Sequence, residues 1–164
     1  MEYTPITFAH SCHRGDAHGI KRVFLVACAG KKRTKANMAM FLYDESPWFR
    51  KARQYVFATR DEWFILSAKH GLLHPREWIE PYDLSMNSLT APQRKLWAEK
   101  VAIDYMGMFK GSATAVLLAG EAYRHFLLPA LEQRGIMVSV PMKGLGIGEQ
   151  MRWLDRECGK ELFV

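Results

Sequence analysis

The sequence predicts an α/β fold, with three α/β/α layers built around a four-stranded parallel sheet. Four apolar runs of strand length alternate with segments whose apolar residues repeat at helical spacing. Each interval between runs is long enough for a helical crossover, which connects parallel strands with right-handed topology. With the strands numbered along the chain, we expect the order 2-1-3-4, which places a switch point between the first and third strands.

The four expected strands are continuous apolar runs, which is typical of strands covered by helices on both faces. They span residues 21–28, 62–67, 114–118 and 136–140. Each strand is followed by a stretch rich in small and polar residues, which read AGKK, SAKHGLL, AGEAY and MKGLGIGEQ in chain order.

Helix signals lie between these strands. Ser46 followed by Pro47 is a favourable helix start, and Thr90 with Pro92 begins the next helix. The first of these helices is expected to end near Ala58 and the second before residue 111. Shorter helical segments are expected at residues 37–43, from about 120 to 134, and through 151–158.

The length of 164 residues predicts one domain, residues 21–164, preceded by a flexible leader at 1–20. No apolar run approaches the ~20 residues needed to span a bilayer, and no secretory signal is visible, so a cytoplasmic protein is expected. Three cysteines without CxxC spacing argue against a disulfide framework and a structural zinc site. The leader carries possible metal ligands, but a flexible segment is favoured and no metal or cofactor is expected: His10, Cys12, His13, Asp16 and His18.

A formal net charge of +6 favours a polyanionic partner such as DNA. The loop after the first strand concentrates that charge in Lys31, Lys32, Arg33 and Lys35. The protein is expected to be a monomer that binds DNA, and no membrane partner is expected.

Ligands of open α/β sheets bind beyond the carboxyl ends of the strands, so the four loops are expected to share one site. Lysines and backbone N–H groups can hold a phosphate, tyrosines can stack on a base, and closely spaced glycines let the backbone approach a ligand. Neither a P-loop nor a dinucleotide-binding fingerprint is present. The candidate substrate-binding residues are Cys28, Gly30, Lys31, Lys32, Lys69, Tyr82, Gly120, Tyr123, Lys143, Gly144, Gly146 and Gly148.

The set ACAGKK, LSAKHGLL, EPYD and GLGIGEQ, in this order, resembles a family of small bacterial and phage domains. That family is similar to the uracil-DNA glycosylase superfamily, and the resemblance covers roughly residues 22–154. It implies a three-layer fold with four parallel strands and metal-free hydrolysis of an N-glycosidic bond. Some relatives act on modified bases, including in phage defence.

The sequence departs from the glycosylase pattern in two loops. Uracil-DNA glycosylases carry an acidic residue or Asn after the first strand and a His after the last, whereas here the first loop has no carboxylate and the last no His. The resemblance therefore suggests other catalytic residues. Asn37 would orient water, Asp83 or Glu149 would stabilise the sugar cation or activate water, and His70 would bond the departing base.

Three functions remain open at this stage. The first is a DNA glycosylase for a modified base. The second is a non-catalytic nucleic-acid or nucleotide-binding module, which the missing carboxylate favours. The third is an enzyme that processes free nucleosides or nucleotides.

Overall fold

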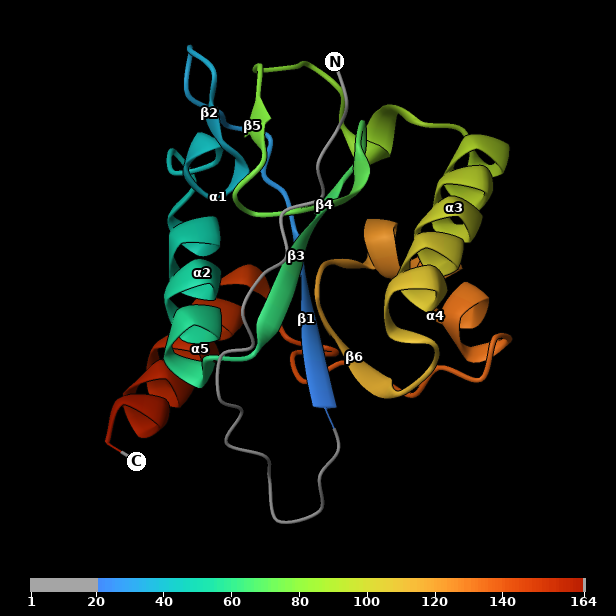
Figure 1. The fold of residues 1–164 in the computed structure, drawn as a ribbon. Coiled ribbons are helices and arrows are strands. Elements are labelled where there is room, and N and C mark those ends of the chain that lie inside the picture. The colour runs from blue at the N-terminus through green and yellow to red at the C-terminus, as the bar shows by residue number, and fades with distance from the viewer. Residues whose placement is uncertain (1–20, 164) are drawn as a thin grey trace, which may run out of the picture.

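A central parallel strand organises the computed structural model, which describes residues 21–163. This strand, β1 (Lys21–Ala27), lies between the parallel strands β3 (Glu62–Ser67) and β6 (Ala113–Leu118). Beyond β6 lies the short parallel strand β7 (Val138–Ser139), and beyond β3 lies the antiparallel strand β4 (Gly71–Leu73). The sheet order is therefore β4-β3-β1-β6-β7 (Figure 1).

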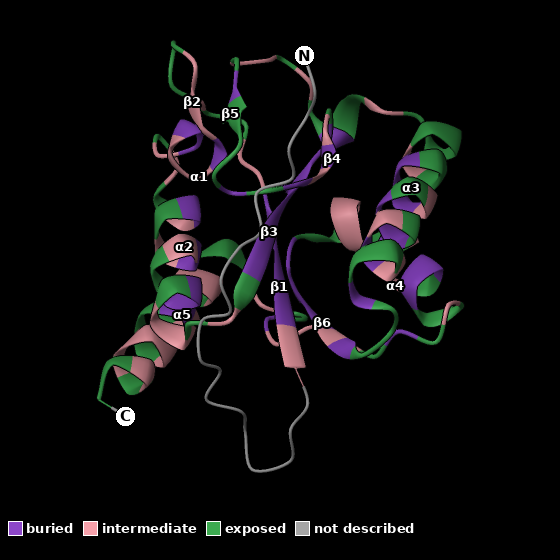
Figure 2. Cartoon of the chain, in the orientation of Figure 1, coloured by how far each residue is buried: buried purple, intermediate pink, exposed green. Residues whose placement is uncertain are grey.

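Two pairs of helices cover the two faces of this sheet (Figure 1). One pair is α2 (Pro47–Thr59) with α5 (Ile147–Leu162), and the other is α3 (Ala91–Phe109) with α4 (Glu121–Glu132). Alternate residues of β1 supply both cores: Val23 and Leu25 face α3 and α4, whereas Phe24 and Val26 face α2 and α5. Both faces of the central strands are accordingly buried (Figure 2).

The predicted helix starts are confirmed by their capping contacts. The Ser46 hydroxyl accepts the Phe49 N–H at 3.2 Å, and Pro47 occupies the first turn of α2. Thr90 and Gln93 form a reciprocal capping box at the start of α3. Such caps satisfy backbone N–H groups that have no partner within the helix.

Small elements lie beyond the carboxyl ends of the sheet strands (Figure 1). Strands β2 (Asn37–Met38) and β5 (Trp78–Ile79) pair antiparallel, with Asn37 opposite Ile79. Helix α1 (Ala39–Leu42) follows β2, and the 3₁₀ turn η1 (Met86–Ser88) precedes α3. These elements hold the loops after β1 and β3 against each other.

The α/β class and the 2-1-3-4 order of the four predicted strands are confirmed, but a purely parallel four-stranded sheet is wrong. The stretch Gly71–Leu73, expected as loop, folds back on β3 as the antiparallel edge strand β4. Gly71 makes this reversal possible because its φ of +70° is strained for residues with a Cβ. The fourth strand is shorter than predicted, and α5 begins within the predicted last loop. The expectations for the leader and its metal ligands lie outside the described residues.

The seating of α5 on the sheet gives a test of the fold. Leu154 of α5 is fully buried, whereas Leu162 of the same helix is 70% exposed. Leu154→Ala should lower the free energy of unfolding by about 2–5 kcal/mol, because it leaves a cavity in the core. Leu162→Ala, the matched control, should change it by less than about 0.5 kcal/mol. Urea denaturation measures both, and equal effects would contradict this packing.

Candidate functional site

The ends of two neighbouring parallel strands bring a thiol and a phenol together at the switch point of the sheet. Cys28 follows β1 directly, and Tyr123 lies in the first turn of α4, just after β6. The Cys28 Sγ lies 3.0 Å from the Tyr123 Oη. The contact therefore bridges the place where ligands of doubly wound sheets bind.

Further hydroxyl groups extend this contact into a connected group, the hydroxyl cluster, formed by Cys28, Tyr43, Ser67, Tyr82 and Tyr123. The Tyr82 Oη lies 2.7 Å from the Tyr43 Oη and 2.7 Å from the Ser67 Oγ. It also donates to the Cys28 Sγ at 3.7 Å. Because Ser67 accepts the backbone N–H of His70 at 3.0 Å, its own proton is free to be donated to Tyr82.

The hydroxyl cluster is held in place from several elements. Tyr43 directly follows α1 and is fully buried, as is Ser67 at the end of β3. Trp97 of α3 donates its indole N–H to the Ser67 carbonyl at 2.8 Å, and its ring meets the Tyr123 ring edge-on at 5.6 Å. These contacts fix the positions of the hydroxyl groups before any ligand arrives.

Burial keeps the phenols of the hydroxyl cluster protonated. It raises the pKa of Tyr43, Tyr82 and Tyr123 well above the ordinary value of 10.0, and the nearby Cys28 adds to each shift. At neutral pH these groups are uncharged hydrogen-bond donors and acceptors. Their hydroxyls donate and accept hydrogen bonds within the cluster, and raised pKa values do not suit them to act as bases.

His70 borders the hydroxyl cluster with an unused ring nitrogen. Its ring meets the Tyr82 ring edge-on at 5.3 Å. Its Nε2 is shielded from solvent and has no hydrogen-bond partner among residues 21–163. Burial lowers the pKa of His70 below 6.5, the Lys69 ammonium lowers it further, and Glu77 opposes the shift. The lowered pKa favours the neutral imidazole at pH 7, and Nε2 keeps hydrogen-bonding capacity that no described residue uses.

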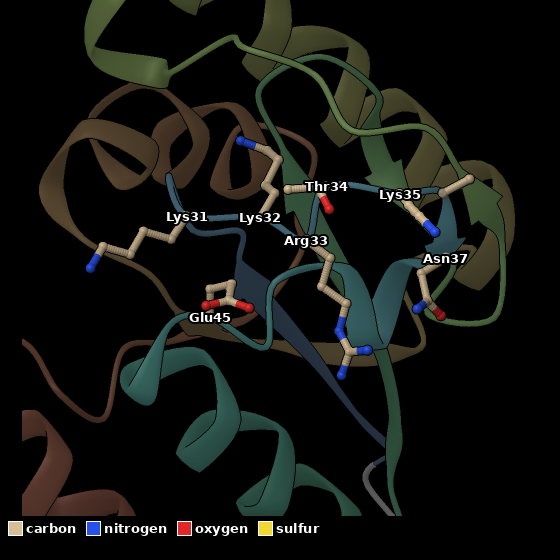
Figure 3. Close-up of a pocket in the computed structure, with 8 residues that line it drawn as sticks. Lys31, Lys32, Arg33, Thr34, Lys35, Asn37 and Glu45 are labelled. Carbon is tan, nitrogen blue, oxygen red and sulfur yellow. The ribbon is translucent and has the colours of Figure 1, made fainter.

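A cationic depression adjoins the cluster, and we call it the basic hollow (Figure 3). It has a volume of about 700 Å³ and lies over the loop between β1 and α1. Its lining residues are Lys31, Lys32, Arg33, Thr34, Lys35, Ala36, Asn37 and Glu45. Lys32 also belongs to the cluster side, because its Nζ lies 4.4 Å from the centre of the Tyr82 ring. The basic hollow and the hydroxyl cluster are thus neighbours that share Lys32.

The structure gathers a large part of the predicted site. Residues at or next to the hydroxyl cluster are Cys28, Lys32, Lys69, His70, Tyr82 and Tyr123. Lys31 and Asn37 line the basic hollow, and the Gly30 carbonyl accepts the Lys32 ammonium at 3.2 Å. Sequence reasoning missed Tyr43, Ser67 and Trp97 as site residues. Ser67 was recognisable as the last residue of a strand, whereas nothing local distinguished Tyr43 from a core tyrosine.

The two carboxylates predicted for the site do not join the hydroxyl cluster. Glu149 is exposed and accepts the Gly146 N–H at 2.8 Å, so it caps the start of α5. Asp83 follows Tyr82 but its side chain is exposed. Within the part of the chain that the structure describes, no carboxylate hydrogen-bonds to the hydroxyl cluster. Neither Asp83 nor Glu149 is therefore placed to take a proton from the hydroxyl cluster directly. A bound ligand would have to lie between the carboxylate and the cluster.

The remaining predicted residues lie at helix starts and on the loop before α5. Gly120 and Gly146 are the N-cap residues of α4 and α5, and Gly148 lies in the first turn of α5. Gly144 has a φ of +79°, a backbone conformation that favours glycine. Lys143 is exposed beside it. Their local roles are therefore structural, and ligand contact by these residues stays a prediction.

Two features are absent from residues 21–163. No helix there combines the length and apolarity needed to cross a membrane. Nor do three His, Cys, Asp or Glu side chains gather closely enough there to hold a metal ion.

Fold and site together define an α/β protein with uncharged hydroxyl groups at its strand ends and a cationic loop beside them. The chain belongs to the family of unknown function DUF6884, whose model matches residues 23–156. It is 30% identical over 119 residues to the uncharacterized protein YfjM of Bacillus subtilis (strain 168), an alignment that covers 68% of this chain and 74% of YfjM.

Other relatives match over smaller shares of their own length. The recombination protein RecR of Xylella fastidiosa (strain Temecula1 / ATCC 700964) is 30% identical, over 79% of this chain and 58% of RecR. A UPF0246 protein of Ralstonia pickettii (strain 12J) is 34% identical, over 46% of this chain and 32% of that protein. No solved structure gives a significant match. These relatives do not test the resemblance to uracil-DNA glycosylases, which stays a prediction.

The environment of His70 predicts its titration. Because Lys69 contributes to the lowered pKa, Lys69→Ala should raise the pKa of His70 while burial still holds it below 6.5. NMR titration of the ring carbons measures this change, and Lys95→Ala on the exposed side of α3 is the charge-matched control. An unchanged pKa in Lys69→Ala would contradict the described geometry.

The same shift has a consequence for stability. The folded state binds the His70 proton more weakly than the unfolded state, so this contribution to stability is present above pH 6.5 and is lost as the pH falls through the folded pKa. His70→Gln should therefore make the free energy of unfolding less sensitive to acid. The comparison with the unsubstituted protein isolates His70 from His74, whose pKa burial also lowers.

Proposed function

We propose that the chain binds DNA and hydrolyses the N-glycosidic bond of a modified base, leaving an abasic site. The observation that carries this proposal is the neutral His70, whose Nε2 has no partner within residues 21–163, at the edge of the hydroxyl cluster and beside a cationic loop. The arrangement offers a polar, uncharged place for a base and a positive place for its phosphates.

The basic hollow suits the DNA backbone. Lys31 and Lys35 are exposed on its rim, and Lys32 reaches inward from it. Lysines that neutralise phosphates release counterions, which supplies affinity without regard to sequence. The resemblance between this chain and a protein named for recombination is consistent with such a partner.

The hydroxyl cluster suits an extruded base. Enzymes that act on a base take it out of the helix and read its edge by hydrogen bonds. Protonated Tyr and Ser hydroxyls can donate to ring nitrogens and carbonyls, or accept from amino groups. Stacking on Tyr82 requires a movement, because the Lys32 ammonium lies over that ring at 4.4 Å.

The proposed reaction adds water across the glycosidic bond. The oxygen of water bonds to C1′ of the sugar, and the C1′–N bond breaks with its electron pair leaving on the base. One proton of that water finally resides on the base, which leaves as the neutral molecule. A neutral His70 carrying its proton on Nε2 would donate a hydrogen bond to the departing base, and the Asp83 carboxylate would stabilise the sugar cation.

A second function has support from a specific observation. The hydroxyl cluster has no hydrogen-bonded carboxylate among the described residues, and its phenols are held neutral. A non-catalytic module that binds nucleic acid or nucleotides needs no more than this. The same groups could also serve an enzyme acting on free nucleosides or nucleotides.

Base release tests the catalytic proposal. The purified protein is incubated with modified phage genomic DNAs, and mass spectrometry detects free bases and abasic sites. His70→Ala and Asp83→Ala should each lower the rate by about 10²–10⁴-fold, the usual contribution of a positioned acid–base group. His125→Ala, which alters an exposed histidine on α4, is the matched control.

Two results would decide against this assignment. Unchanged rates in both His70→Ala and Asp83→Ala would remove these residues from the reaction. Tight DNA binding without release of any base would favour the binding module instead.

The salt dependence of DNA binding tests the role of the basic hollow. Lys31→Ala should weaken binding to all sequences and reduce the slope of log K against log salt by about 1. Lys95→Ala removes the same charge from the exposed side of α3 and should leave the slope unchanged. Fluorescence anisotropy at several salt concentrations measures both, and identical slopes would exclude a phosphate contact at Lys31.

A further inference from the structure

Two lysine ammonium groups converge on one aromatic ring at the proposed site. Lys32 comes from the loop after β1, and Lys69 from the turn between β3 and β4. Their Nζ atoms lie 4.4 Å and 5.6 Å from the centre of the Tyr82 ring. Loops from two adjacent strands thus bring two positive charges to the same aromatic ring.

Neither ammonium group is neutralised by a carboxylate within residues 21–163. The Lys32 Nζ donates to the Gly30 carbonyl at 3.2 Å and otherwise lies over the rings of Tyr82 and Tyr43. Other lysines of the chain do have carboxylate partners, as in the pairs Lys51–Asp155, Lys100–Asp104 and Lys160–Glu157. An ammonium group has three donors, so Lys32 and Lys69 retain capacity to bind an anion.

His70 adds a third polar group at the same ring. It follows Lys69 in the chain, its ring meets Tyr82 at 5.3 Å, and its Nε2 lacks a hydrogen-bond partner in the described part of the chain. A shielded nitrogen without a partner is unusual, because such groups are normally satisfied by protein or ligand. It points to a ligand atom beside Tyr82.

We propose that Lys32 and Lys69 form a phosphate-binding subsite at the ring of Tyr82, beside His70 and at the edge of the basic hollow where Lys32 lines it. This inference deepens the proposed function and rests on it for the rest of the ligand, a nucleotide whose base contacts the hydroxyl cluster. The phosphate belongs either to a DNA strand, as a phosphodiester, or to a free nucleotide, as a monoester.

The chemistry of the two lysines favours phosphate. Lysine ammonium groups act as compact point charges and can surround a tetrahedral anion, whereas planar carboxylates are best matched by the fork of arginine. Both lysine stems are flexible, so each ammonium can leave the ring and follow the anion. Movement of Lys32 towards the phosphate would uncover a face of Tyr82, which makes that face available to the base.

Inorganic phosphate is the first probe, and NMR titration of the His70 ring monitors its binding. Bound phosphate should raise the pKa of His70, because a nearby anion favours the imidazolium form over the effects of Lys69 and burial. Glu77, the other charge acting on His70, is present with and without phosphate. A ligand on the rim of the basic hollow would leave this pKa almost unchanged.

Variants locate the phosphate. Lys32→Ala and Lys69→Ala should each weaken phosphate binding about tenfold, the effect of losing one charged hydrogen bond. Lys95→Ala, which removes an exposed charge from α3, should leave the affinity unchanged. A His70 pKa that does not change with phosphate, or a loss of affinity in Lys95→Ala as large as in Lys32→Ala, would overturn the inference.

Two further probes identify the source of the phosphate. A deoxynucleoside monophosphate that needs Lys32 and Lys69 for binding would support a monoester. A single-stranded oligonucleotide without terminal phosphates that needs both lysines would support a phosphodiester. Binding of either probe that is unaffected by Lys32→Ala and Lys69→Ala would overturn the subsite.

The base-release assay separates this inference from the proposed function. Base release that persists at full rate in Lys32→Ala and Lys69→Ala, without phosphate binding at His70, would overturn the subsite and leave the glycosylase proposal intact. Lysine-dependent phosphate binding without any base release would support the subsite and count against catalysis.

Discussion

The register of three parallel strands is the constraint on which the site depends. Ala27 of β1 pairs with Leu66 of β3, and Val26 pairs with Leu118 of β6, so all three strands end at the same level. Cys28 and Ser67 therefore lie at one edge of the sheet, and the start of α4 brings Tyr123 to the same edge. A slip of one residue in either pairing would reverse which face each side chain occupies and would disperse the hydroxyl cluster.

The hydroxyl cluster also shows how the fold tolerates polar groups in its interior. Burying a phenol without a hydrogen bond is costly, and the cluster avoids this cost because the Tyr82 hydroxyl bonds to both Tyr43 and Ser67 at 2.7 Å. Networks of this kind fix a single arrangement, because each member depends on the others. The Nε2 of His70 stands out against this background, since within residues 21–163 it alone among shielded side-chain nitrogens and oxygens has no partner. The exception lies where the sheet topology places ligands, and this coincidence links the packing to the proposed function.

Local signals in the sequence were sufficient for much of the fold. Ser46-Pro47 and Thr90 correctly indicated where α2 and α3 begin. The strand Glu62–Ser67 was predicted with its observed bounds. The edge strand Gly71–Leu73 was missed because three residues carry too little periodicity to be told from a loop.

At the site, His70, Lys69 and Tyr82 were predicted from their place after a strand. The hydrogen bond between Tyr43 and Tyr82, which lie 39 residues apart in the sequence, could not be predicted, because it depends on tertiary packing. Glu149 was predicted as a catalytic residue, but its spacing from Gly146 is that of a capping box, which is the role it has in the structure.

The four cations of the loop after β1 do not have equivalent surroundings. Arg33 is paired with Asp44 at 3.1 Å, and Lys31 and Lys35 are exposed to solvent, where salt screens their fields. Lys32 is half-buried against Tyr82, where its charge acts through a medium of lower dielectric and is screened less. The outer lysines are therefore suited to attracting a polyanion from a distance, and Lys32 to recognising one phosphate at contact. Since Lys32 lines the basic hollow and its ammonium also lies over the Tyr82 ring of the hydroxyl cluster, it is the residue that links the proposed phosphate site to the proposed site for a base.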